Sequence, residues 1–92
     1  MDISRKQIEE WVEGYGDEIL LADGFDEAFI GITEVFGRPS IANYDRDKCI
    51  RILMERDGMT EGDAIDYFNY NVTGAWVGET TPAFTTLMRD MV

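Results

Sequence analysis

The chain has 92 residues, 45% of them hydrophobic and 12% aromatic, so it can bury the core of one domain and does not have the composition of a disordered segment. Its formal net charge is -11, and it contains one cysteine and no histidine. These counts exclude an internal disulfide, a Cys/His zinc site and any catalytic centre that needs a histidine base.

The charged residues are unevenly distributed along the chain. No Lys or Arg occurs from Gln7 to Gly37 or from Asp57 to Met88, and both stretches are rich in Asp and Glu. An acidic surface repels phosphate, so direct nucleic-acid binding is disfavoured. The apolar runs are far shorter than the ~20 residues of a membrane-spanning helix, and the N-terminus has no signal-like segment. We therefore expect a cytoplasmic protein that does not bind membranes.

The first predicted element is an amphipathic helix from about residue 5 to 14. Ser4 is placed to cap it, and Gln7 completes a capping box. The apolar residues that follow at helical spacing are Ile8, Trp11, Val12 and Tyr15. Gly14 is expected to end the helix, whose other face is acidic.

Three short strands are predicted next. The first is the apolar run Glu18–Ala22, which lies between glycines. The run 27–36 fits either a helix capped by Asp26 or a strand. We favour the strand because its residues are β-formers and Gly31 weakens a helix by ~1 kcal/mol relative to alanine. The third strand is Ile41–Tyr44, and together the three predict an antiparallel meander.

The C-terminal half is predicted to form a helical hairpin. Asp45 caps its first helix, which Gly58 ends, and Thr60 caps its second helix, for which Gly78 is the expected C-terminal cap. The predicted inward face of the second helix consists of Ala64, Ile65, Phe68, Val72, Ala75 and Trp76. Ile50, Leu53, Phe68 and Val72 are expected in the core. Three apolar residues of the tail, Phe84, Leu87 and Met88, are expected to cover an open edge of it.

The fold class expected from these elements is α+β. The 92 residues form a single domain with an N-terminal helix, a short three-stranded antiparallel meander and a C-terminal helical hairpin.

Two acidic segments are candidate metal sites. They are the loop Asp23–Glu27 and the pair Asp45 and Asp47, which could serve a small metal-dependent enzyme. The loop lacks the EF-hand order of ligands, so we favour a polar turn and a helix cap, and we predict no metal, cofactor or catalytic residue. Cys49 lies on the apolar face of its predicted helix, which indicates a buried, inert thiol.

The helical hairpin resembles a DNA-binding motif in outline only. The helix that would read the bases lacks cations and carries Asp63 and Asp66 instead. Tyrosines are effective interface anchors, and Tyr67 and Tyr70 belong to the same helix. The alternative is that Tyr67 packs in the core and that Tyr70 is exposed without a role. The residues predicted to contact a partner are Asp63, Asp66, Tyr67 and Tyr70, together with Asp23, Asp26 and Glu27 of the acidic loop.

Several segments together resemble a group of small, uncharacterised proteins carried by tailed bacteriophages and prophages. They are Asp23–Ala28 with Ile30-Gly31, Tyr44–Ile50, Gly58–Thr60, Tyr67–Val72 and Gly74–Pro82. The resemblance covers roughly residues 18 to 84. It implies a phage or prophage origin and action inside a bacterial host cell, and it transfers no catalytic residue because the group has no known activity.

The function expected from these observations is that of a non-enzymatic acidic protein that modulates a host protein. Its partner would have a basic surface, as a nuclease, a defence effector or a transcription component has, and inhibition would follow from blocking a nucleic-acid-binding surface. The metal-dependent enzyme is the alternative. The sequence leaves open the identity of the partner, the oligomeric state and whether the acidic residues share one face.

Overall fold

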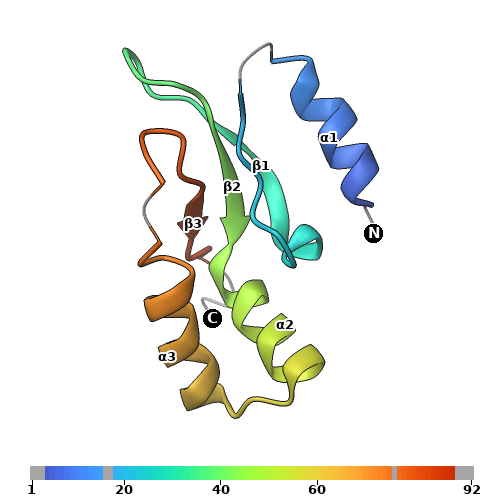
Figure 1. Cartoon of the computed structure of the whole chain (residues 1–92), viewed down its shortest axis with the longest axis vertical. Helices are drawn as coiled ribbons and strands as arrows, with labels where there is room; N and C mark the ends of the chain where they lie inside the picture. The colour runs from blue at the N-terminus through green and yellow to red at the C-terminus, as the bar shows by residue number, and fades with distance from the viewer. Residues whose placement is uncertain (1–3, 16–17, 76, 89–92) are drawn as a thin grey trace.

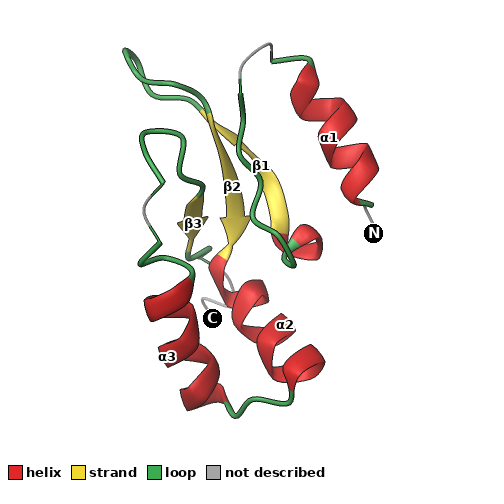
Figure 2. Cartoon of the chain, viewed as in Figure 1, coloured by secondary structure: helices red, strands yellow, loops and turns green. Residues whose placement is uncertain are grey.

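The computed structural model describes residues 4–15, 18–75 and 77–88. Its elements are α1 (Arg5–Glu13), the 3-10 turn η1 (Asp26–Ala28), β1 (Phe29–Thr33), β2 (Ile41–Asp45), α2 (Arg46–Asp57), α3 (Glu61–Asn71) and β3 (Ala83–Thr85). The helices α2 and α3 form a hairpin at one end of a small sheet, and α1 lies beside β1 (Figures 1 and 2). The α+β class and the presence of three helices are therefore confirmed.

The sheet has three strands, but one of them is not the segment that the predicted meander assigned. β2 is central, pairing antiparallel with β1 and parallel with β3. The segment Glu18–Ala22 is not a strand. Its last residue donates its N–H to the hydroxyl of Tyr44 at 2.8 Å, and Ile19 and Leu21 pack against the core. Parallel pairing requires a long crossover connection, which the hairpin of α2 and α3 supplies between β2 and β3.

The ambiguous run 27–36 is a strand, but a shorter one than predicted. The turn η1 takes up its first residues, and β1 ends at Thr33. The pairing with β2 shifts between Phe29 and Gly31, so Ile30 is the extra residue of a bulge. Gly31 has a φ of 149°, which a residue with a side chain rarely adopts, and this explains a glycine inside a strand.

The three N-terminal helix caps predicted from the sequence are confirmed. Ser4 and Gln7 form a complete capping box at α1, Asp45 accepts a hydrogen bond from the backbone N–H of Lys48 at 3.3 Å, and Thr60 accepts one from Asp63 at 3.2 Å. These bonds satisfy backbone donors that a helix leaves unpaired in its first turn.

The predicted end of α3 is wrong. The helix ends at Asn71, with Val72 as its C-cap, and does not continue to Gly78. The hydroxyl of Thr73 donates to the carbonyl of Asn69 at 3.3 Å and so takes a bond that the next helical turn would need. The predicted inward position of Trp76 lies outside the described residues, and Ala75 is exposed.

The core lies where the hairpin meets the sheet. Its fully buried residues include Tyr44, Leu53 and Phe68, and Ile50 is also buried. The tail reaches this core through Phe84, whose ring stacks on Tyr44 at 5.6 Å between centroids and meets Phe68 edge-on at 5.0 Å. The expectation that the tail covers the core is therefore confirmed for Phe84 and wrong for Met88, which is 83% exposed. Val72, expected in the core, packs against it while only partly buried.

The helix α1 packs with only part of its predicted apolar stripe. Ile8 and Val12 are buried, whereas Trp11 and Tyr15 remain 48% and 42% exposed. None of the described helices is long and apolar enough to cross a membrane.

The corner between α2 and α3 yields a test of backbone conformation. Gly58 has a φ of 69°, and no atom lies within 4 Å of the place where a Cβ would be. Gly58→Ala is therefore expected to destabilise the fold by about 1 kcal/mol through backbone strain alone. Gly62→Ala in α3, equally free of close contacts, should instead be neutral or stabilise by up to ~1 kcal/mol. Urea denaturation of both variants checks this, and equal effects would contradict it.

Candidate functional site

The predicted contact residues of α3 form one continuous exposed stripe. Asp63, Asp66, Tyr67 and Tyr70 are separated by three, one and three positions, which places them on one side of a helix. All four are exposed, and the tyrosines are 43% and 84% exposed. The opposite side of α3 is buried through Ala64 and Phe68. We call the four exposed residues the α3 stripe.

The acidic loop 23–27 is held on one side by Arg5 of α1. The guanidinium of Arg5 contacts Oδ1 of Asp23 at 3.0 Å and Oδ1 of Asp26 at 3.4 Å, and it also pairs with Glu9 at 3.2 Å. The carboxylates of Asp23, Asp26 and Glu9 raise the pKa of Arg5, against the opposing effect of burial. Two of the predicted contact residues are thus already engaged within the chain.

The other side of the loop is held by Arg56 of α2. Its Nη1 donates to the carbonyl of Gly24 at 2.7 Å, and its guanidinium lies over the buried ring of Phe25 at 5.8 Å. Hydrogen bonds to Asp57, together with the charge of that carboxylate, raise the pKa of Arg56 against the opposing effect of burial. Arg56 therefore fixes the loop against α2.

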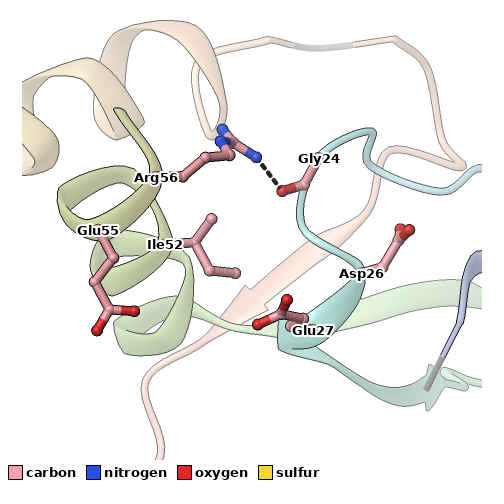
Figure 3. Close-up of a pocket in the computed structure, with 6 residues that line it drawn as sticks. All are labelled: Gly24, Asp26, Glu27, Ile52, Glu55 and Arg56. Carbon is pink, nitrogen blue, oxygen red and sulfur yellow. Dashed lines mark hydrogen bonds between the residues drawn. The ribbon is translucent and has the colours of Figure 1, made fainter. Parts of the chain in front are cut away.

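A cleft of ≈ 410 Å³ separates the loop from α2. It is lined by Gly24, Asp26, Glu27, Ile52, Glu55 and Arg56. Figure 3 shows Ile52 projecting from α2 toward the loop, Arg56 reaching across to Gly24, and Asp26 turned away from α2. The cleft thus has an aliphatic floor and charges of both signs at its edge, which suits a contact with another protein better than the enclosed site of a reaction.

The two acidic segments do not combine into a metal site. The described residues contain no group of three or more His, Cys, Asp or Glu that could hold a metal ion. In the loop, Asp23 and Asp26 face the cation of Arg5, while Asp45 is buried as the cap of α2. This arrangement offers no support for the metal-dependent enzyme.

Cys49 is fully buried in the core, as predicted. Burial, with a smaller contribution from the charge of Asp45, raises the pKa of its thiol to about 12. We expect the folded protein at pH 8 to react with a disulfide reagent at least ~100-fold more slowly than the urea-unfolded chain, because the thiolate is the reactive form. Rapid reaction of the folded protein would contradict this.

The same pKa shift predicts how stability changes at alkaline pH. The pKa of Cys49 is higher in the folded state, so its contribution to stability is complete below the unfolded pKa of ~8.5 and is lost as the pH rises toward about 12. Urea midpoints of the wild type and Cys49→Ala should therefore draw closer together above pH 9.

Sequence reasoning missed the roles of the two arginines. Arg5 lies 18 and 21 positions from its partners in the loop, and Arg56 lies 32 positions from Gly24. No local pattern signals contacts over such separations. Sequence spacing did indicate the α3 stripe, because all four of its residues belong to one helix.

The fold and this surface define a small α+β protein with a mixed three-stranded sheet and an acidic, tyrosine-bearing helix face. Comparisons of the chain with models of protein families, with curated proteins and with solved structures found no match.

Proposed function

We propose that this chain is a non-enzymatic interaction protein of phage origin that binds a basic surface of a host protein inside the bacterial cell. The observation that carries the proposal is the α3 stripe, in which two carboxylates and two exposed tyrosines lie on one side of a well-packed helix. Tyrosine buries a large area at low conformational cost, and carboxylates around it select a cationic partner.

The charge around the stripe supports a basic partner. Glu61 precedes the stripe in the first turn of α3, and no Lys or Arg occurs from Asp57 to Met88. Such a surface accelerates the encounter with a cationic protein and repels nucleic acid. A partner that binds nucleic acid has a cationic surface of this kind, so occupation of that surface by α3 would block it.

The acidic loop supplies a second acidic surface to the proposed contact. Its residue Glu27 is exposed at the cleft beside α2. Arg5 and Arg56 fix the loop before binding, which lowers the entropy lost when a partner docks. The loop therefore offers a preformed acidic surface, and the tyrosines of the α3 stripe supply the apolar area of the contact.

The test is affinity capture from bacterial lysate with three forms of the protein. They are the wild type, the stripe variant Asp63→Asn/Asp66→Asn/Tyr70→Ala, and the control variant Glu13→Gln/Glu18→Gln, which removes the same number of charges from exposed positions elsewhere. We expect a protein that the wild type and the control retain and the stripe variant loses, with retention that weakens as salt rises.

The captured protein is then purified and tested with nucleic acid. The wild type should displace the nucleic acid from it, and the stripe variant should do so at least ~10-fold less well. Recovery of nothing reproducible at low and moderate salt would sink the proposal, as would equal retention by all three forms.

A further inference from the structure

Two Asp-Gly pairs in the chain are open to a reaction between neighbouring residues. The backbone nitrogen of the glycine can attack the carboxyl carbon of the preceding aspartate, because glycine has no side chain to obstruct the approach. The pairs are Asp23-Gly24 and Asp57-Gly58. Since their covalent chemistry is the same, a difference in their reactivity must come from the fold.

The pair Asp23-Gly24 has the freedom that this reaction needs. Both residues lie in an exposed turn outside the helices and strands, and the side chain of Asp23 is 93% exposed. Its Oδ1 accepts a hydrogen bond from Arg5 at 3.0 Å, while its Oδ2 has no partner among the described residues. In the same part of the chain, the N–H of Gly24 makes no hydrogen bond. Both reacting groups are therefore accessible.

The contact between Gly24 and Arg56 leaves the attacking nitrogen free. Arg56 donates to the carbonyl of Gly24 at 2.7 Å (Figure 3). That carbonyl belongs to the peptide group after Gly24, whereas the attacking nitrogen belongs to the peptide group before it. The two groups are joined through the torsions of a glycine with a φ of 88°, a conformation that glycine adopts without steric cost. The peptide group between Asp23 and Gly24 can therefore turn toward the carboxyl group.

The pair Asp57-Gly58 is held in two ways. Arg56 donates to both carboxylate oxygens of Asp57, at 3.1 Å each, and these bonds lower the pKa of that carboxyl group. Asp57 is also the last residue of α2, so its backbone torsions are helical. A reaction within a chain requires its reacting atoms in a near-attack orientation. The clamped carboxylate and the helical torsions keep Asp57 and Gly58 out of that orientation.

We propose that Asp23-Gly24 is a site of spontaneous succinimide and isoaspartate formation in the folded protein, and that the fold protects Asp57-Gly58. The nitrogen of Gly24 forms a bond to Cγ of Asp23, and the carboxyl OH leaves with the amide hydrogen as one molecule of water. Water then opens the ring at either carbonyl. Opening at the main-chain carbonyl carbon of Asp23 continues the chain through Cγ and gives isoaspartate, with no net change in mass and no other reactant.

The product changes the acidic loop. The backbone of isoaspartate is longer by one carbon, and its free carboxylate is the former main-chain carbonyl group. The side-chain carboxyl group that Arg5 contacts at 3.0 Å becomes part of the peptide bond, so this contact is lost in its present form. The proposal does not depend on the proposed function, because no partner takes part in the reaction.

The test is incubation of the purified full chain, folded and in urea, at mildly acidic pH, where more of the carboxyl group is in its reactive protonated form. Trypsin places the two sites in different peptides, because Lys48 and Arg51 lie between them. Electron-based fragmentation then distinguishes isoaspartate from aspartate. In the folded chain we expect isoaspartate to form at least ~10-fold faster at Asp23 than at Asp57, and in urea we expect similar rates at both.

A substitution in α1 tests the restraint that the ion pair places on Asp23. Arg5→Gln frees the carboxylate to turn, so isoaspartate should form at Asp23 at least ~3-fold faster, with the rate at Asp57 unchanged. The matched control is Lys6→Gln, which removes an exposed cation of the same helix outside this ion pair and should change neither rate.

The wild-type comparison decides the proposal without either variant. No isoaspartate at Asp23, or equal rates at the two sites in the folded chain, would overturn it. A preference for Asp23 that persists in urea would also overturn it, because the fold would then not be the cause. Circular dichroism checks that the incubated chain and the variants remain folded.

Discussion

Replacing Tyr44 with alanine is expected to destabilise the fold by about 3–5 kcal/mol, the range for deletion of a large buried ring. Tyr44 is fully buried on the central strand, where Phe84 stacks on its ring at 5.6 Å and Phe29 meets it edge-on at 5.5 Å. Domains of this size have a free energy of unfolding of only ~5–14 kcal/mol. The variant should therefore lose a large part of its stability, measured as a fall in the urea midpoint.

The conservative variant separates the ring of Tyr44 from its hydroxyl. The hydroxyl accepts a hydrogen bond from the N–H of Ala22 at 2.8 Å, and burial raises the pKa of this hydroxyl. Tyr44→Phe keeps the ring and leaves that N–H without its partner, which should cost about 1–3 kcal/mol. Hydrogen exchange at Ala22 should accelerate in both variants. If Tyr44→Phe were as unstable as Tyr44→Ala, the ring would contribute nothing beyond the hydroxyl, which would contradict the prediction.

Replacing Phe68 with alanine is expected to destabilise the fold by a similar amount, about 3–5 kcal/mol. Phe68 is fully buried on the inner side of α3. It meets Phe84 edge-on at 5.0 Å and Phe25 at 6.3 Å, and the guanidinium of Arg46 lies over its ring at 5.5 Å. The substitution therefore removes contacts to the acidic loop, to α2 and to the tail at the same time.

The neighbouring tyrosine is the control for this prediction. Tyr67→Ala truncates an aromatic residue of the same helix that is 43% exposed, and it should cost less than about 1 kcal/mol. Phe68→Ala should also increase hydrogen exchange in Ala83–Thr85, because Phe84 loses its partner. Comparable destabilisation by the two substitutions would contradict the assignment of inner and outer faces to α3.

The stability measurements also serve as controls for the binding experiments. Substitutions in the α3 stripe change exposed positions, so the fold should persist when binding is lost. The aromatic core, by contrast, supports the α3 stripe through Phe68 and the acidic loop through Phe25. Loss of partner binding in a core variant would report unfolding and say nothing about the contact.

Local sequence determined where the helices begin and what charge they carry. The caps at Ser4, Asp45 and Thr60, and the stop at Gly58, each depend on residues within three or four positions. Interactions of that range are encoded without regard to the rest of the fold. For the same reason the α3 stripe could be predicted, since helical spacing alone brings its members to one side.

Only the tertiary structure decided which segment becomes the third strand. Glu18–Ala22 has the apolar pattern of a strand, yet the place beside β2 is taken by Ala83–Thr85. Phe84 packs between Tyr44 and Phe68 there, and the hydroxyl of Thr85 donates to the side chain of Asn43 at 2.8 Å across 42 positions. The competition between two apolar segments is settled by how well each fills the core, which no local pattern records.

The sequence by itself therefore determined an acidic α+β domain with capped helices, a buried thiol and an exposed acidic, tyrosine-bearing helix face. The tertiary structure decided the mixed sheet, the two arginine contacts that hold the acidic loop, and the cleft between that loop and α2. The difference has one physical cause. Capping and helical periodicity act over one or two turns, whereas strand partners, long-range ion pairs and grooves exist only after distant segments have packed together.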